Sequence, residues 1–187
     1  RCFVLRGEGK HFGVGADLTE FGNADSISEA RRIRWERDPW NLLLSLEVPS
    51  IALLHGFAMG SSLEMALLCD IRIAASDTVL GLPETKLGML PAAGGTQSLT
   101  RVIGANKALP LILTARNIDA KEALSLGVVS EVVPPGDLEK HGISCAQRIA
   151  LMDLSLTSRL KRCISGAGDL SLAQGLELEK RLASQIR

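Results

Sequence analysis

The chain lacks a net charge, because its 21 Lys and Arg residues balance its 21 Asp and Glu residues. A broad electrostatic attraction to nucleic acid or to an anionic membrane surface is therefore not expected. The sequence also lacks a signal peptide and any apolar run near the roughly 20 residues of a membrane-spanning helix. These absences predict no membrane partner. The expected location is the cytoplasm or, because the chain starts without Met, as it would after loss of a targeting peptide, the mitochondrial matrix.

The few cysteines lack the spacing of a metal site or a redox pair. Cys2, Cys69, Cys145 and Cys163 are scattered along the chain, without a CxxC or CxxH pattern. No metal ligands are therefore predicted. Cys69 lies within an apolar run, so we expect a buried free thiol there, which suits a reducing compartment.

The length and the pattern of the chain indicate one α/β domain. Its 187 residues, of which 46% are hydrophobic, suit a single compact core. In residues 1–104, β-rich runs alternate with helical patterns, which is typical of parallel βαβ units. We expect one helix over residues 26–46, and one strand over residues 50–60 that leads straight into the next helix. Residues 105–187 are mainly helical and are expected to belong to the same domain.

A single glutamate stands out in the apolar helix that follows residue 60. Glu64 is surrounded by Leu63, Met65 and the run from 66 to 69, so no face of this segment is polar. Burying a carboxylate without a partner costs several kcal/mol or forces it to take up a proton. Glu64 therefore has either a structural counter-ion or a chemical role. It lies four residues after Gly60, at a strand-to-helix junction whose free N–H groups favour a developing negative charge.

Two further features have the character of a site. Glu84 follows a strand in the segment GLPET, where a proline stiffens the turn and the glycine-rich PAAGG follows. The loop HFGVGADL has Gly13 and Gly15, which let the backbone approach a ligand, but it lacks the third glycine of a dinucleotide fingerprint. Ser61 and Ser62 do not fit the Gly-x-Ser-x-Gly pattern of a serine hydrolase.

A basic patch is expected on the helix near residue 30. Its arginines alternate with acidic residues, which usually indicates a solvated face, and an RNA or phosphate contact is the weaker interpretation. The arginines of this patch are Arg31, Arg32, Arg34 and Arg37.

Taken in order, these segments resemble the enoyl-CoA hydratase/isomerase family, the crotonase superfamily. The resemblance covers nearly the whole chain, and it is carried by HFGVGADL, GFAMGSSLEMALLCDIRIAA, GLPETKLGMLPAAGGTQSLTRVIG, LTARNIDAKEALSLGVVSEVVP and SLAQGLELEK. It implies a crotonase-like spiral of ββα units, with the thioester site in residues 1–104. It also implies a helical C-terminal region, residues 105–187, that is used in oligomerisation. The implied substrate is an acyl thioester of coenzyme A in fatty acid metabolism, and no separate cofactor is implied, because coenzyme A is part of the substrate.

The resemblance also implies roles for particular residues. The backbone N–H groups of Ala16 and Ser61 would form an oxyanion hole, Glu64 would hold and deprotonate a water molecule, and Glu84 would be the acid. Because both carboxylates would share one water, their titrations are coupled. The residues expected to bind coenzyme A or the substrate, with 16–18 against the adenine end, are Gly15, Ala16, Asp17, Leu18, Gly60 and Ala92.

The chain departs from the family's pattern at three positions of the site. Ser61 and Ser62 stand where the family usually has the second and third glycines of Gly-Gly-Gly, and Ala92 stands where a glycine is common. The expected activity is hydration of a 2-enoyl-CoA to a 3-hydroxyacyl-CoA. The alternatives are an enoyl-CoA isomerase, which needs the oxyanion hole and Glu84, and a weakly active homologue with a binding role.

The last segment of the chain predicts an assembly. Five leucines are spread around a short terminal helix, which is stable mainly when its apolar face is packed. By resemblance, the expected assembly is a homotrimer or a dimer of trimers, with this helix at the interface. The alternative is that the helix covers its own core. The leucines are Leu170, Leu172, Leu176, Leu178 and Leu182.

Overall fold

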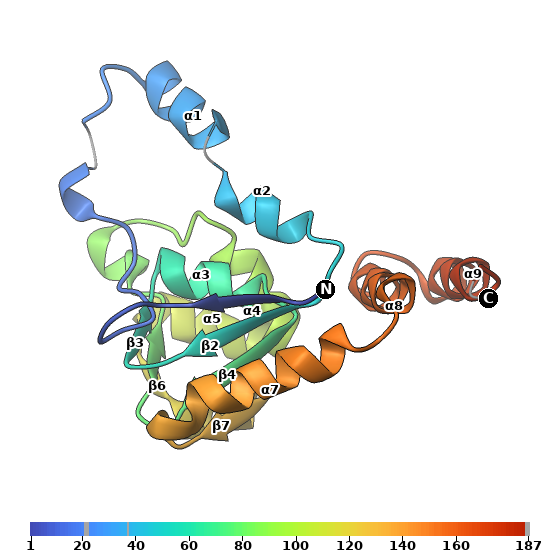
Figure 1. The fold of residues 1–187 in the computed structure, drawn as a ribbon. Helices are drawn as coiled ribbons and strands as arrows, with labels where there is room; N and C mark the ends of the chain where they lie inside the picture. Colours follow the sequence, from blue (N-terminus) through green and yellow to red (C-terminus); the bar gives the residue numbers. More distant parts are fainter. Residues whose placement is uncertain (21–22, 37, 186–187) are drawn as a thin grey trace.

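The computed structural model describes residues 1–20, 23–36 and 38–185, and these residues form two small sheets surrounded by helices (Figure 1). The first sheet is parallel throughout, in the order β1-β2-β4-β7. Its strands are β1 (Phe3–Arg6), β2 (Ser50–Leu54), β4 (Ile71–Ala75) and β7 (Glu131–Val133). In the second sheet β5 pairs in parallel with β3 and antiparallel with β6. Its strands are β3 (Phe57–Met59), β5 (Val79–Gly81) and β6 (Ile118–Asp119).

The helices follow the strands in the alternating order expected of an α/β fold. The α-helices of the described residues are α1 (Ile27–Glu36), α2 (Pro39–Leu44), α3 (Ser61–Leu67), α4 (Gly95–Ile103), α5 (Ala105–Thr114), α6 (Ala120–Leu126), α7 (Leu138–Ala150), α8 (Leu154–Gly166) and α9 (Leu172–Ala183). Three short 3-10 helices are η1 (Leu18–Glu20), η2 (Glu84–Leu87) and η3 (Pro135–Asp137).

Strand β2 is buried on both faces, which explains its unbroken apolar sequence. Successive side chains of a strand point to opposite faces of the sheet. Ala52 and Leu54 accordingly join the main core with residues of α3 to α6, whereas Ile51 and Leu53 join a second core. The second core is closed by α7, which lies along the sheet in Figure 1. A strand covered by helices on both faces has a continuous hydrophobic run rather than an alternating one.

The expected strand over residues 50–60 is wrong, because the structure divides it between the two sheets. β2 ends at Leu54 and β3 begins at Phe57, and the chain turns at Gly56 with φ +54°. A side chain at Gly56 would also lie 2.6 Å from His11 Nδ1. Glycine allows both the left-handed conformation and the close approach of the neighbouring loop.

The single helix expected over residues 26–46 is also wrong. α1 ends at Glu36, and α2 begins at Pro39 with Asp38 as its N-cap, whose side chain accepts a hydrogen bond from Asn41 N at 3.0 Å. Proline lacks an N–H group and clashes with the preceding turn, so it starts a helix far more readily than it continues one. Arg37, which belongs to the predicted basic patch, lies outside the described residues.

The C-terminal helices α8 and α9 lie beside the core rather than within it (Figure 1). α8 is attached by Lys161, whose Nζ lies 2.9 Å from Asp70 Oδ2 and donates to Val48 O at 3.0 Å. Among the residues that the structure describes, no helix is both long and apolar enough to cross a membrane. The buried free thiol expected at Cys69 is confirmed, and burial raises its pKa to about 11.

Candidate functional site

A cavity of about 730 Å³ opens between the loop after β1, the start of α3 and the segment around η2. The structure brings almost every predicted site residue to its wall: Gly15, Ala16, Leu18, Gly60, Ser61, Glu64, Glu84 and Ala92. Asp17 does not line it. The Asp17 carboxylate instead accepts hydrogen bonds from the Thr19 side chain (2.7 Å) and backbone (2.9 Å), which lower its pKa and order the start of η1.

Glu64 is held in the cavity wall by backbone N–H groups. It lies in the middle of the short helix α3 and is 2% exposed. Its Oε1 accepts hydrogen bonds from Ala93 N at 3.0 Å and from Gly95 N at 2.7 Å. Gly95 is the first residue of α4, where N–H groups have no acceptor within their own helix, and Ala93 lies two residues before it. An ionised carboxylate only accepts hydrogen bonds, so these donors are the partners that a buried glutamate needs.

The glycine at residue 95 makes this contact possible. A Cβ atom there would lie 2.8 Å from Glu64 Oε1 and 2.9 Å from Pro91 Cβ. The absent side chain lets the backbone of α4 approach the carboxylate directly. Sequence reasoning missed Ala93 and Gly95, because a backbone donor leaves no signal in residue type. The glycine pair in PAAGG was a signal of close approach, without indicating to which atom.

Glu84 has a different environment on the other side of Gly60. It is the first residue of η2, directly after Pro83, and it is half-buried. Its Oε2 atom is buried and has no hydrogen-bond partner among the described residues. Burial is the main cause that raises the pKa of Glu84 above its ordinary value. A Cβ at Gly60 would lie 3.1 Å from Glu84 Oε1, and Gly60 has φ +54°, a positive value that favours glycine.

Two residues with unused backbone donors line the same cavity. The N–H groups of Ala16 and Ser61 make no hydrogen bond to any of the residues that the structure describes. Ser61 is the first residue of α3, so its N–H belongs to the turn that lacks intrahelical acceptors. A pair of unused donors beside two carboxylates is the arrangement in which negative charge on an oxygen of a ligand can be stabilised.

The rest of the cavity wall is largely apolar. Trp40 in α2 and Ile33 in α1 line it, which sequence reasoning did not anticipate because these helices precede the site by many residues. Several aliphatic side chains of the wall are also exposed: Val14, Leu18, Leu87 and Leu90. Such a surface suits the hydrocarbon part of a ligand. Within residues 1–20, 23–36 and 38–185, no group of three or more potential ligands could hold a metal ion.

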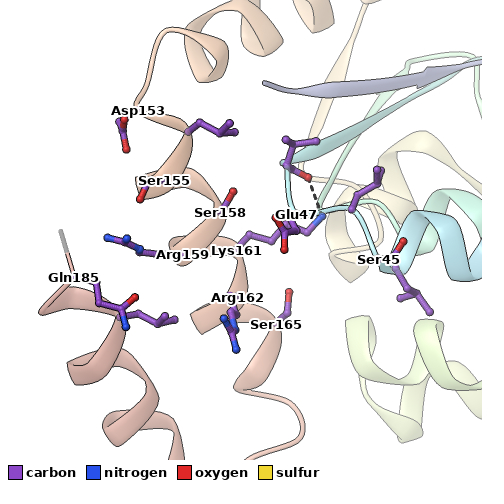
Figure 2. A pocket seen from close by; sticks show the side chains of 15 residues that line it. Ser45, Glu47, Asp153, Ser155, Ser158, Arg159, Lys161, Arg162, Ser165 and Gln185 are labelled. Carbon is purple, nitrogen blue, oxygen red and sulfur yellow. Dashed lines mark hydrogen bonds between the residues drawn. The ribbon is translucent and has the colours of Figure 1, made fainter.

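A second hollow, of about 760 Å³, contains none of the predicted site residues (Figure 2). It lies between residues 44–48 and the helices α8 and α9, and Figure 2 shows Lys161 crossing it to donate to Val48 O. Its carboxylates, Glu47 and Asp153, come from different segments and do not point toward one another in Figure 2. Asp153 caps α8 by accepting from Leu156 N at 2.9 Å. The candidate site is therefore the cavity with Glu64 and Glu84, although it is not the larger hollow.

Arg32 of α1 provides no comparable site. Arg32 lies 2.6 Å from Glu29 and 2.7 Å from Glu36 on the same helix, and all three side chains are partly exposed. Pairs at this spacing are typical of a solvated helix face.

The chain is similar to known proteins along its whole length. A family model described as Enoyl-CoA hydratase/isomerase matches residues 1–187. The Mycobacterium bovis protein named "Probable enoyl-CoA hydratase echA8" is 40% identical over 184 residues, which are 97% of this chain and 70% of that protein.

Solved structures extend the similarity to the fold. The enoyl-CoA hydratase of Bacillus anthracis is 38% identical and superimposes with a TM-score of 0.92 over 98% of this chain and 72% of that chain. A Thermobifida fusca protein named for the same activity, in a crystal structure with CoA, is 30% identical with a TM-score of 0.91, over 98% and 75% of the two chains. The match of the family model over the whole chain, together with these superpositions, shows that the protein has the crotonase fold and belongs to the enoyl-CoA hydratase/isomerase family.

Proposed function

We propose that the protein adds water to the double bond of a 2-enoyl-CoA thioester and produces a 3-hydroxyacyl-CoA. The observation that carries this proposal is the presence, in one cavity, of two carboxylates with different surroundings beside two unused backbone N–H groups. The names of the relatives and the CoA in the Thermobifida fusca structure support an acyl-CoA substrate.

The thioester carbonyl is the proposed acceptor for the N–H groups of Ala16 and Ser61. Cβ of an enoyl thioester becomes electrophilic as electron density moves to the carbonyl oxygen. Donors already directed at that oxygen stabilise the enolate-like transition state without reorganising. The loop of residues 15–18 then contacts the coenzyme A part of the substrate, and Gly60 and Ala92 contact the thioester.

The two glutamates share the proton transfers. Glu64 accepts a proton from water, and the hydroxide oxygen forms a bond to Cβ. Glu84 gives its proton to Cα, so water has been added across the double bond while one glutamate gains a proton and the other loses one. The assignment follows the environments: Glu64 accepts two N–H bonds as a carboxylate does, and burial favours the protonated form of Glu84. Exchange of protons with solvent water restores both groups.

Isomerisation of a 3-enoyl-CoA is the second candidate, and one observation favours it. Glu84 has a buried oxygen without a partner among the described residues, whereas Glu64 Oε1 is held by two donors. A single carboxylate that moves a proton between two carbons would need only Glu84 and the oxyanion hole.

An absorbance assay of the purified protein separates these candidates. Hydration removes the absorbance of the conjugated 2-enoyl thioester, whereas isomerisation of a 3-enoyl-CoA creates it. Short-chain and long-chain substrates should both be tested. Loss of absorbance with 2-enoyl-CoA supports hydration, a gain with 3-enoyl-CoA alone supports the isomerase, and binding without turnover supports a homologue that has only a binding role.

We further propose a homotrimer or a dimer of trimers as the assembly. In α9, Leu172 is 80% exposed and Leu176 is 56% exposed, whereas Leu182 is buried against the rest of the chain. The helix therefore covers its own core through one leucine and leaves others available for a second subunit. Contiguous exposed apolar side chains on a short helix favour an interface.

A further inference from the structure

The two N–H groups of the proposed oxyanion hole come from segments that are distant in sequence. Ala16 belongs to the loop after β1, whereas Ser61 begins α3. Both must lie within hydrogen-bond distance of one oxygen atom, so their separation decides how well they stabilise its charge. A contact that fixes one segment against the other therefore acts on the chemistry without touching the substrate.

Backbone hydrogen bonds at Gly13 attach the loop to β3, the strand that precedes α3. Gly13 N donates to Phe57 O at 3.0 Å, and Met59 N donates to Gly13 O at 3.0 Å. These bonds hold the loop three residues before Ala16. Beyond Gly13, the loop is attached directly to α3 through Gly15 N, which donates to Ser62 Oγ at 3.2 Å.

The Ser62 side chain also fills the space between loop and helix. A Cβ atom added at Gly13 would collide with Ser62 Oγ and would lie 2.7 Å from Ser62 Cβ. Gly15 itself has φ +100°, a conformation that glycine adopts readily, and it turns its N–H toward the serine. Ser62 is half-buried and lines a small hollow beside the loop, not the wall of the 730 Å³ cavity.

We propose that Ser62 is a positioning residue, whose hydroxyl sets the separation of the Ala16 and Ser61 N–H groups. The proposal rests on the proposed hydration function. The bond joins the two residues that directly neighbour the donors: Gly15 precedes Ala16, and Ser62 follows Ser61.

Ser62→Ala removes the acceptor and keeps the helix. We expect kcat for 2-enoyl-CoA hydration to fall by about tenfold, the effect of one lost hydrogen bond of ordinary strength, while KM changes by less than about twofold. Ser130→Ala is the matched control, because Ser130 Oγ donates to Arg72 O at 2.9 Å far from the cavity, and it should leave kcat unchanged.

A spectroscopic measurement reports the oxyanion hole directly. The probe is a 2-enoyl-CoA with an electron-donating aryl group conjugated to the thioester, whose absorption moves to longer wavelength when the carbonyl is polarised. Wild-type protein and Ser130→Ala should produce the full shift, and Ser62→Ala a smaller one at saturating probe. A merely structural role of Ser62 would lower stability without reducing the shift.

A double-mutant cycle tests the contact without any substrate. Gly13 has no left-handed φ, so Gly13→Ala is opposed only by the Ser62 side chain. The thermal midpoint should fall for Gly13→Ala in the wild-type background and fall clearly less in the Ser62→Gly background. Equal falls in both backgrounds would show that loop and helix do not meet at Ser62, and would overturn the proposal.

The outcomes for the two proposals are distinguishable. A wild-type protein that shifts the probe and hydrates enoyl-CoA, together with a Ser62→Ala variant of equal shift and equal kcat, refutes the role of Ser62 alone. A wild-type protein that neither shifts the probe nor hydrates the substrate refutes the proposed function and the positioning role with it.

Discussion

Glu64→Gln is the sharpest test of the role proposed for the water-activating carboxylate. The amide keeps the shape of the side chain and one oxygen, which can still accept the bonds from Ala93 N and Gly95 N at 3.0 and 2.7 Å. It has no negative charge and takes no proton from water at neutral pH. We therefore expect kcat for a four-carbon 2-enoyl-CoA to fall by at least about 100-fold, the usual effect of removing a positioned acid or base.

The stability cost of this variant also follows from the two bonds. A hydrogen bond to a charged acceptor contributes about 1.5–3 kcal/mol, and a neutral one about 0.5–1.5 kcal/mol. Removing the charge from an acceptor of two bonds therefore costs about 2 kcal/mol. For a chain of this length, that lowers the midpoint of thermal unfolding by about 4–8 °C. The variant should fold and bind substrate, so its loss of activity is a loss of chemistry.

The assay combines the enoyl-thioester absorbance with a thermal melt followed by circular dichroism. Glu122→Gln is the control, because Glu122 forms a surface ion pair with Arg116 at 2.7 Å. Such exposed pairs contribute about 0–1 kcal/mol, so this variant should change the midpoint little and kcat not at all. Near-wild-type activity of Glu64→Gln would refute the two-carboxylate mechanism and leave Glu64 with a structural role only.

Three further predictions concern Glu84, Gly95 and the assembly. Burial raises the pKa of Glu84, so the fold favours its protonated form; stability is fully present below the ordinary pKa of about 4.3 and is lost as pH rises through the raised value. In paired melts, the thermal midpoint of Glu84→Gln minus that of wild type should therefore be larger at pH 8 than at pH 4. An equal difference at the two pH values would contradict this. Gly95→Ala should lower kcat by about 100-fold and stability by about 1–3 kcal/mol, because its Cβ meets Glu64 Oε1 at 2.8 Å. Gly136→Ala, with no atom within 4 Å of its Cβ in η3, should be harmless by the same kinetics and melts. Light scattering at micromolar concentration should show a trimer or larger that Leu172→Gln with Leu176→Gln dissociates; a wild-type monomer would rule the assembly out.

The positions that the sequence predicted well are those whose residue type conflicts with its neighbours. Glu64 is a carboxylate within an apolar helix, and the structure confirms its burial at 2% exposure. The α/β class was also predictable, because alternating strands and helices have different hydrophobic periods. The division of residues 50–60 was not, because both halves are β-rich and the φ of +54° at Gly56 leaves no mark in the pattern. The break between α1 and α2 was missed, although Asp38 and Pro39 carry the capping signal of a new helix.

The side-chain partners of the site could not be predicted from local pattern for a physical reason. Glu64 is bound by N–H groups about 30 residues later, and the Gly15 N–H is bound by a hydroxyl about 50 residues later. Backbone donors are present at nearly every residue. Which donor is used depends on where two segments of the chain meet. The hydrophobic pattern predicts which strands and helices pack together, but not which of their residues are in contact.

The glycines of the sequence give a partial signal of where these close contacts form, which the other residue types do not give. Three polar side chains at or beside the cavity lie where a glycine leaves room: Glu64 against Gly95, Glu84 against Gly60, and Ser62 against Gly13. Of these glycines, Gly60 alone has a positive φ, so the other two are required by close approach and not by backbone conformation. Glu64 and Ser62 accept hydrogen bonds from backbone N–H groups of these glycine-bearing segments, whereas Gly60 only leaves room for Glu84. In the proposed mechanism the oxyanion donors are main-chain N–H groups, so the side chain at residue 61 can differ from the glycine of the resembling family's pattern without removing a donor.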